Sequence, residues 1–264
     1  MKWGTGLRAL AVALGVALLG VALSGCTTAQ KRADQRQEAR RAVSHLDIGA
    51  DHLVNDRSAL ALREFLTAEK LDPKNPRIQY GLAQAYWARE RYEDVELHLR
   101  RALELNPEYD DARLTLSALL IRLERYEEAI VECNTLVEDA TVPGPWRPLA
   151  NRGFAEMKLG RLADARRSLE RARDFNRDFW PATLSLAMLE AEEGRRLEAI
   201  GLYSKILDQE PGASAESEVN YRVAEIYIAL GKRDRALGHL NAAVAREPEG
   251  QWAAKSEEYL KLLR

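Results

Sequence analysis

One pattern of 34 residues recurs along most of this 264-residue chain. A small residue marks the same point of each copy, at Ala61, Val95, Ala129, Ala165, Ala199 and Ala236, with spacings of 34, 34, 36, 34 and 37 residues. Four copies close on a proline, which ends a helix because it lacks a backbone donor: Pro73, Pro107, Pro211 and Pro248. Such a period predicts stacked helical units that bury a core only by packing against their neighbours.

The first copy carries the motif that identifies the unit. It reads His45-x-x-Ile48-Gly49-x-x-His52, followed by Ala61-x-x-x-Phe65, Ala68 and Pro73. This spacing resembles the tetratricopeptide signature, in which each copy is a pair of antiparallel helices. We therefore predict an all-α fold, a right-handed α-solenoid of six tetratricopeptide helix-turn-helix repeats with a C-terminal capping helix.

The repeats are predicted to occupy residues 42–250, with first helices starting near 42, 76, 110, 146, 180 and 217. Small residues on these helices mark where the second helix crosses closely, at Gly49, Ala83, Ser117, Gly153, Ala187 and Ala224. Residues 251–264 form an amphipathic pattern that fits a cap on the last repeat.

The N-terminal segment resembles a lipoprotein signal. Lys2 and Arg8 precede an uncharged run from Ala9 to Ser24, and the segment ends in Leu23-Ser24-Gly25-Cys26, which matches the lipobox of bacterial lipoproteins. We predict a signal peptide over residues 1–25, acylation of Cys26 and a lipidated polar tether over residues 26–41. The alternative is a cysteine that happens to end a signal anchor.

Resemblance to bacterial lipoproteins also predicts a subcellular location. Thr27 and Thr28 stand where an aspartate would retain a lipoprotein at the inner membrane. The expected location is the outer membrane, with the lipid-anchored protein facing the periplasm.

Motifs for catalysis are missing from the sequence. It shows no Gly-rich phosphate loop, nucleophile elbow or zinc-binding helix motif. Lysine and arginine are spread evenly among acids at a net charge of −2, which argues against nucleic acid. We expect no enzyme activity, no cofactor and no small-molecule substrate.

Two polar groups leave alternatives open. His45 and His52 share a helix face near Asp51 and Glu64, so a metal site competes with simple packing, which we favour. Cys133 falls in a row of apolar residues on the second helices, where burial is the favoured interpretation and an intermolecular disulfide the other one.

The first helices of tetratricopeptide arrays line a concave groove. The fifth and twelfth positions of these helices are apolar in every copy, and residues seven apart share one helix stripe. The predicted groove residues are Leu46, Leu53, Tyr80, Trp87, Leu114, Ile121, Phe154, Met157, Leu184, Met188 and Tyr221. Ordinary packing between repeats is the alternative for the series, whereas bulky aromatics and methionines favour contact with a partner.

The fourth copy departs from the pattern in two adjacent places. Arg152 and Glu156 occupy positions that are normally apolar, and their spacing of four allows them to pair. A longer loop precedes them, with Pro143, Pro145 and Trp146 as its candidate binding residues. Two adjacent departures from the repeat pattern, the polar pair and the longer loop, indicate a functional site more often than chance variation.

The lipobox, the six repeats and Cys133-Asn134 followed by the Pro-rich insert together resemble the type IV pilus biogenesis and stability lipoproteins (PilF/PilW-like). That resemblance implies a pilotin, which helps the pilus secretin to reach the outer membrane and form its ring, or stabilises pili. Members often have a second cysteine after the insert; this chain has Met157 in that region, so no bridge to Cys133 is expected.

The expected function is therefore a non-catalytic scaffold whose partner is a secretin subunit of a type IV pilus machine. The alternative is a general periplasmic adaptor for peptidoglycan enzymes or outer-membrane biogenesis complexes.

Overall fold

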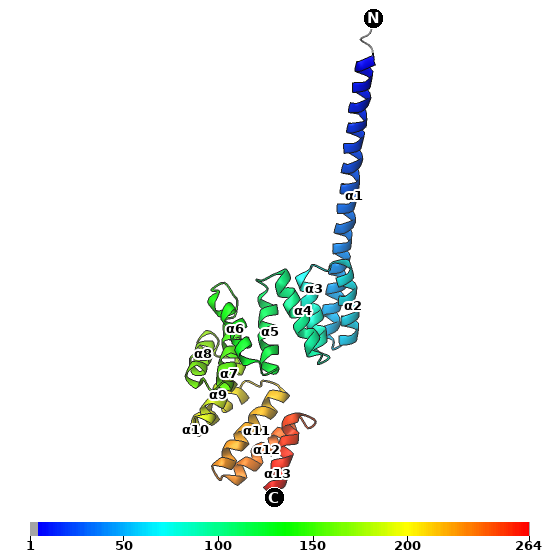
Figure 1. Ribbon diagram of the computed structural model, residues 1–264. Coiled ribbons are helices and arrows are strands. Elements are labelled where there is room, and N and C mark those ends of the chain that lie inside the picture. The colour runs from blue at the N-terminus through cyan, green and yellow to red at the C-terminus, as the bar shows by residue number, and fades with distance from the viewer. Residues whose placement is uncertain (1–4, 264) are drawn as a thin grey trace. The chain divides into compact units, whose positions relative to one another are not determined.

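The chain is built of helices joined by turns. The computed structural model describes the backbone of residues 5–263 and the side chains of residues 30–263, and in that range it contains helices and no strands (Figure 1). The helices are α1 Thr5–Val54, α2 Ser58–Leu71, α3 Pro76–Trp87, α4 Tyr92–Leu105, α5 Asp110–Arg122, α6 Tyr126–Glu138, α7 Trp146–Lys158, α8 Leu162–Phe175, α9 Trp180–Glu192, α10 Arg196–Leu207, α11 Ala213–Ala229, α12 Arg233–Arg246 and α13 Gln251–Leu262. The predicted all-α repeat architecture is confirmed.

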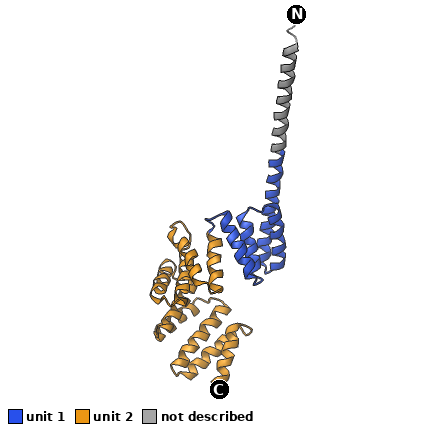
Figure 2. Ribbon diagram, in the orientation of Figure 1, with its two compact units in different colours: residues 1–109 blue, residues 110–264 orange. Residues whose placement is uncertain are grey.

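Consecutive helices pair into six hairpins, which fall into two compact units (Figure 2). Unit 1, Met1–Tyr109, contains the hairpins α1/α2 and α3/α4, and unit 2, Asp110–Arg264, contains the remaining four hairpins and α13.

The predicted starts of the first helices agree with the structure in four repeats. Helices α3, α5, α7 and α9 begin at residues 76, 110, 146 and 180. Helix α11 begins earlier than residue 217, at Ala213, because Gly212 with φ +100° sets its start and Glu216 in its first turn forms an ion pair with Arg246.

The start near residue 42 is wrong, because α1 already includes residues 30–41. This described part of the predicted tether is almost entirely exposed, and its Gln, Lys, Arg and Glu side chains favour a helix even without a core to pack on. Gln30 Nε2 donates to Asp34 Oδ1 one turn later, at 2.9 Å. Ala42 and Leu46 are where α1 enters the core.

The predicted signal segment, residues 1–25, and Cys26 lie outside the residues whose side chains are described. Among the described residues, no helix combines the length and the apolar character that a bilayer crossing requires.

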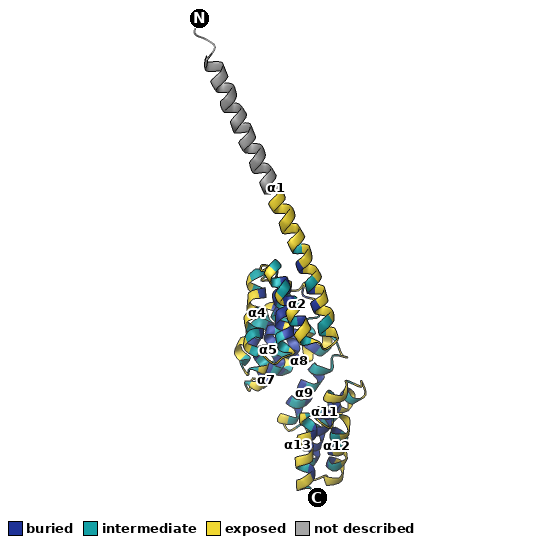
Figure 3. Cartoon of the chain, turned by 90° about the vertical axis from the view of Figure 1, so that its right-hand side faces the viewer, coloured by how far each residue is buried: buried dark blue, intermediate teal, exposed yellow. Residues whose placement is uncertain are grey.

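Each core cluster joins at least three helices, so no hairpin buries its apolar face alone. Figure 3 shows the buried residues between packed helices and the exposed residues on outer faces. In unit 1 one cluster combines α1, α2 and α3 around Phe65 and Leu82. In unit 2 a corresponding cluster combines α7, α8 and α9 around Leu169 and Leu189. The repeat period thus has the physical cause expected of a stacked array.

Small residues set the distance between the helices of a hairpin. A Cβ added at Gly49 would lie 2.5 Å from Phe65 Cε1, and one at Gly153 would lie 2.6 Å from Leu169 Cγ. The four other predicted close-crossing residues are fully buried: Ala83, Ser117, Ala187 and Ala224. A larger side chain at any of these points would force the two helices apart.

The last helix caps the array as predicted. Helix α13 packs on α11 and α12, where Leu260 joins the cluster of Tyr221 and Leu240. The Tyr221 ring lies 5.2 Å from the Trp252 ring and 6.0 Å from the Tyr259 ring, both on α13.

All six hairpins turn through the same backbone motif. A residue with positive φ follows the first helix, and the basic residue after it donates its N–H to a carbonyl five residues back, as in a Schellman motif. The positive-φ residue is acidic in the first three hairpins and glycine in the last three: Asp56, Glu90, Glu124, Gly160, Gly194 and Gly231. The basic residues are Arg57, Arg91, Arg125, Arg161, Arg195 and Lys232.

Candidate protein-binding sites

The predicted groove residues differ in how much surface they offer. Leu46, Met157 and Tyr221 are buried, at 6 %, 4 % and 8 % exposure. The other eight predicted residues are half-buried, which leaves part of each side chain open to a partner: Leu53, Tyr80, Trp87, Leu114, Ile121, Phe154, Leu184 and Met188.

In unit 1 the predicted aromatic residues contact other rings of the same unit. The Tyr80 ring lies 5.2 Å from the Tyr109 ring, and the Trp87 ring meets the Tyr92 ring edge-on at 6.1 Å. Leu46 and Leu53 pack in the cluster around Phe65. Intramolecular packing therefore accounts for much of their surface.

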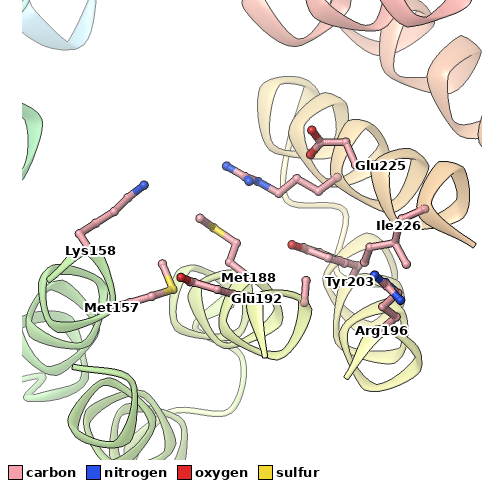
Figure 4. A pocket seen from close by; sticks show the side chains of 11 residues that line it. Met157, Lys158, Met188, Glu192, Arg196, Tyr203, Glu225 and Ile226 are labelled. Atoms are coloured by element: carbon pink, nitrogen blue, oxygen red, sulfur yellow. The ribbon is translucent and has the colours of Figure 1, made fainter. Parts of the chain in front are cut away.

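Unit 2 contains an open cleft of about 440 Å³ formed by α7, α9, α10 and α11 (Figure 4). Its lining includes the predicted residues Met157 and Met188. The other lining residues are Lys158, Ala191, Glu192, Arg196, Tyr203, Arg222, Glu225, Ile226 and Ala229. The figure shows the side chains of Lys158 and Met188 reaching into the open space.

The cleft combines an adaptable apolar floor with charged walls. Met188 is half-buried, and its side chain is flexible and polarizable, as in surfaces that accept varied apolar side chains. Tyr203 forms the base of the cleft at 1 % exposure, and this burial raises the pKa of its hydroxyl. Arg222 is held by Glu218 at 2.6 Å on its own helix. Such a surface can bind a peptide by apolar anchors and polar rim contacts, as protein interfaces do.

A second, smaller hollow lies beside the insert loop, and we call it the insert recess. It measures about 260 Å³ and lies between α5, the end of α6, the loop and the start of α7. Its lining includes the predicted residues Leu114, Pro143 and Trp146; the other lining residues are Asp110, Asp111, Leu136, Val142, Gly144, Arg147 and Pro148. Pro145 belongs to the same loop and precedes α7.

The insert loop is fixed by local contacts. Asp139 Oδ1 accepts hydrogen bonds from Thr141 N at 2.8 Å and Thr141 Oγ1 at 2.7 Å, and these bonds lower the pKa of Asp139. Gly144 has φ +74°, and a Cβ there would lie 3.3 Å from Trp146 Cζ2. The indole therefore packs against the glycine, and the flanking prolines restrict the backbone further.

Arg152 and Glu156 pair as predicted, at 3.6 Å, and they belong to a larger polar network. Arg152 Nε donates to Ser168 Oγ at 3.1 Å, and its Nη1 donates to Asn134 Oδ1 at 3.1 Å. Ser168 Oγ in turn donates to Glu156 Oε2 at 2.6 Å. The network ties α7 to both α6 and α8, so the two polar departures of the fourth repeat satisfy each other inside the fold.

Cys133 is a buried free thiol, which confirms the favoured interpretation. Burial raises its pKa to about 12, although a hydrogen bond with Ser117 and the charge of Arg152 act in the opposite direction. A thiol with that pKa is almost entirely protonated at neutral pH and is a poor nucleophile.

A charge network that the sequence analysis missed joins α8 to the next hairpin. Arg166 Nη1 lies 2.7 Å from Glu190 Oε1, and Arg195 pairs with both Glu190 and Glu193. Glu190 and Glu193 carry no sequence signal for these contacts, because their partner Arg166 lies more than 20 residues away along the chain.

Polar contacts spaced 19 residues apart clasp four of the six hairpins. His45 Nδ1 lies 2.8 Å from Glu64 Oε2, and Arg113 Nη1 donates to Glu132 Oε2 at 2.7 Å. The hydrogen bond from His45 lowers the pKa of Glu64. His45 and Glu64 are thus accounted for by a contact within the hairpin, and no group of three potential ligands among the described residues could hold a metal ion.

The other two clasps contain histidines that also stack on tyrosines. His98 Nδ1 lies 2.8 Å from Gln79 Oε1 and its ring stacks on Tyr86, whereas His239 Nδ1 lies 2.8 Å from Asn220 Oδ1 and its ring stacks on Tyr227. Burial lowers the pKa of both histidines, and for His98 the charges of Glu69 and Asp94 partly oppose this.

Stability is expected to fall as the pH drops below about 6.5, the pKa of an unfolded histidine. The folded state takes up protons at His98 and His239 less readily than the unfolded state, so stability is full above pH 6.5 and is lost as the pH falls towards the folded pKa values. Melting temperatures at pH 7.5 and 5.5 check this. The variant His98→Gln/His239→Gln should lose less between these pH values than the parent, and an equal loss would contradict the assignment.

Sequence comparisons place these sites in a known repeat. Family models described as tetratricopeptide repeat match residues 46–94, 87–150, 151–214 and 190–257. Proteins that contain this repeat are typically scaffolds for protein interaction.

Curated relatives show two kinds of similarity. The chain is 32% identical to the peptidyl-prolyl cis-trans isomerase FKBP42 of Arabidopsis thaliana over 108 residues, which cover 38% of this chain and only 26% of that protein. It is 24% identical to the type IV pilus assembly protein PilF of Pseudomonas aeruginosa over 218 residues, which cover 80% of this chain and 85% of that protein.

Among solved structures, the crystal structure of PilW, described as a widely conserved type IV pilus biogenesis factor, is similar to this fold. It superimposes with a TM-score of 0.70 at 21% sequence identity and covers 81% of this chain and 97% of the other.

Proposed function

Because this chain belongs to the tetratricopeptide repeat family, we propose that it is a non-catalytic scaffold that acts in type IV pilus biogenesis. One observation carries the proposal. The similarity to PilF extends over 80% of this chain and 85% of that protein, so it concerns nearly the whole repeat array and not a few copies of the repeat. The match to FKBP42, by contrast, covers only 26% of that enzyme and supports no catalytic role.

The proposed partner is a secretin subunit of the pilus machine. The support for a secretin is the resemblance to pilus biogenesis proteins, and the cleft of unit 2 supports only a protein partner, since the half-buried Met188 and the mixed charges suit a peptide segment better than a small molecule. Binding there would assist localisation of the secretin, its multimerisation or the stability of pili.

The proposed location of the protein is the outer membrane, where it faces the periplasm. The support is the sequence Leu23-Ser24-Gly25-Cys26, in which an acylated Cys26 would anchor the chain. A few acyl chains suffice for stable anchoring, because each buried methylene contributes about 0.8 kcal/mol.

Deletion of the gene should abolish detergent-resistant secretin multimers and surface pili, and the wild-type gene should restore both. Unchanged multimers and pili in the deletion strain would exclude the pilus role. If the purified protein instead captured cell-wall hydrolases and no secretin, the general adaptor would be the correct function.

Met188→Ala is expected to weaken binding of purified secretin subunits by about tenfold, which corresponds to roughly 1.4 kcal/mol. The half-buried Met188 side chain lines the cleft, so its loss removes an apolar anchor. Fluorescence titration measures the affinity. Val131→Ala is the matched control, because Val131 is 63% exposed on α6 and does not line the cleft. Equal affinity of the two variants would exclude the cleft as the docking surface.

A further inference from the structure

We propose that the insert recess is a second docking site, which receives one bulky apolar side chain of a partner segment that carries Lys or Arg beside it. The proposal concerns a site separate from the cleft, since the two share no lining residue. It does not depend on the pilus assignment, because it follows from the shape and charge of the recess alone.

The walls of the recess are apolar. Leu136 is 2 % exposed and forms part of the core, while Leu114, Val142 and Trp146 present aliphatic and aromatic surface from three different segments. A volume of about 260 Å³ leaves room for a single large side chain and not for a helix. Burial of such a side chain contributes roughly 1.5–3 kcal/mol.

The recess exists before a partner arrives. Trp146 packs against Gly144 and also against the core cluster of Leu149 and Ala172, so contacts within the fold hold the indole that forms one wall. The hydrogen bonds from Thr141 to Asp139 fix the other end of the loop. Because the loop needs little further ordering, most of the burial energy remains for binding.

The charge around the recess selects the partner. Asp111, an exposed residue in the first turn of α5, lines the recess together with Arg147, whereas the neighbouring Asp110 already has an interaction partner within the chain. Glu138, the last residue of α6, and Asp139, the first residue after it, add two exposed carboxylates. Acids therefore outnumber bases here, and a partner with Lys or Arg next to its apolar residue complements them. Complementary charge of this kind mainly raises specificity and the rate of association.

Three short peptides, acetylated and amidated to remove their terminal charges, test the proposal against the purified full-length chain. They contain Lys-Phe-Lys, Glu-Phe-Glu or Lys-Ala-Lys between glycines. Fluorine NMR of protein labelled with fluorinated tryptophan reports binding at Trp146, whose resonance is assigned by its loss in Trp146→Phe.

The Lys-Phe-Lys peptide should shift the Trp146 resonance with a dissociation constant at least about tenfold lower than those of the other two. In Asp111→Lys the preference over Glu-Phe-Glu should vanish or reverse, whereas the control Asp174→Lys, which changes an exposed acid on α8, should keep it. Melting temperatures of both variants show that they fold. No shift with any peptide, or equal shifts with all three, would overturn the proposal, and neither result would bear on binding at the cleft.

Discussion

Cys26→Ser should remove the protein from the outer-membrane fraction almost completely. Serine has no thiol to acylate, so the variant loses every methylene that would hold the chain in the lipid, at about 0.8 kcal/mol for each. Fractionation of cell envelopes followed by immunoblotting measures the distribution, and incorporation of labelled palmitate reports the acylation directly. Cys133→Ser is the matched control, because it removes the other cysteine of the chain and leaves the lipobox intact.

A Cys26→Ser protein that still sediments with outer membranes after washing in high salt would show that something other than lipid holds it there. In that case the protein would be held at the outer membrane by something other than an acylated Cys26, while the proposed docking surfaces would be unaffected.

Arg152→Leu should lower the free energy of unfolding by about 3 kcal/mol, because it leaves the buried Glu156 carboxylate without its cation. For a chain of this size the melting temperature should fall by roughly 6–12 °C. Urea denaturation followed by circular dichroism gives the free energy. The control Arg167→Leu, at an exposed position on the neighbouring helix α8, should change stability by no more than about 0.5 kcal/mol.

The double variant Arg152→Leu/Glu156→Leu should recover most of this loss. Leu116 and Leu120 hold the same two positions in the third repeat, so an apolar pair is compatible with the hairpin. Replacing a whole buried ion pair by apolar residues is often neutral, whereas breaking it is costly. If the double variant were as unstable as the single one, the network would contribute packing that leucine cannot supply.

Much of the fold could be predicted from the sequence because it is repeated. The repeat period predicts four helix starts correctly, and its fixed spacing marks the small residues at the helix crossings, such as Gly49 and Gly153. Residues 30–41 have no apolar face, so the sequence predicts a tether there. They form part of α1 because strong helix formers continue a helix that the core of unit 1 stabilises only from Ala42 onward.

The candidate sites were predicted less completely. Spacing along the first helices identified Met157 and Met188, but the cleft also needs Tyr203 from a second helix, which that spacing does not mark. The prolines mark the insert in the sequence. Leu136 and Val142, however, line the recess with Trp146 only because α6 and α7 pack together. Pairs such as Arg152 with Asn134 and Ser168 depend on three helices at once, and no sequence period reports them.

The acidic residues at the first three hairpin turns mark positions where the stability of the fold can still be increased. Asp56, Glu90 and Glu124 hold a left-handed backbone that costs a residue with a side chain roughly 1 kcal/mol, whereas glycine already occupies that point in the later copies. Single substitutions of these residues by glycine should therefore raise the free energy of unfolding of the amino-terminal repeats, one repeat at a time. Each change would act on a tight bend of the main chain and leave the cleft and the insert recess untouched.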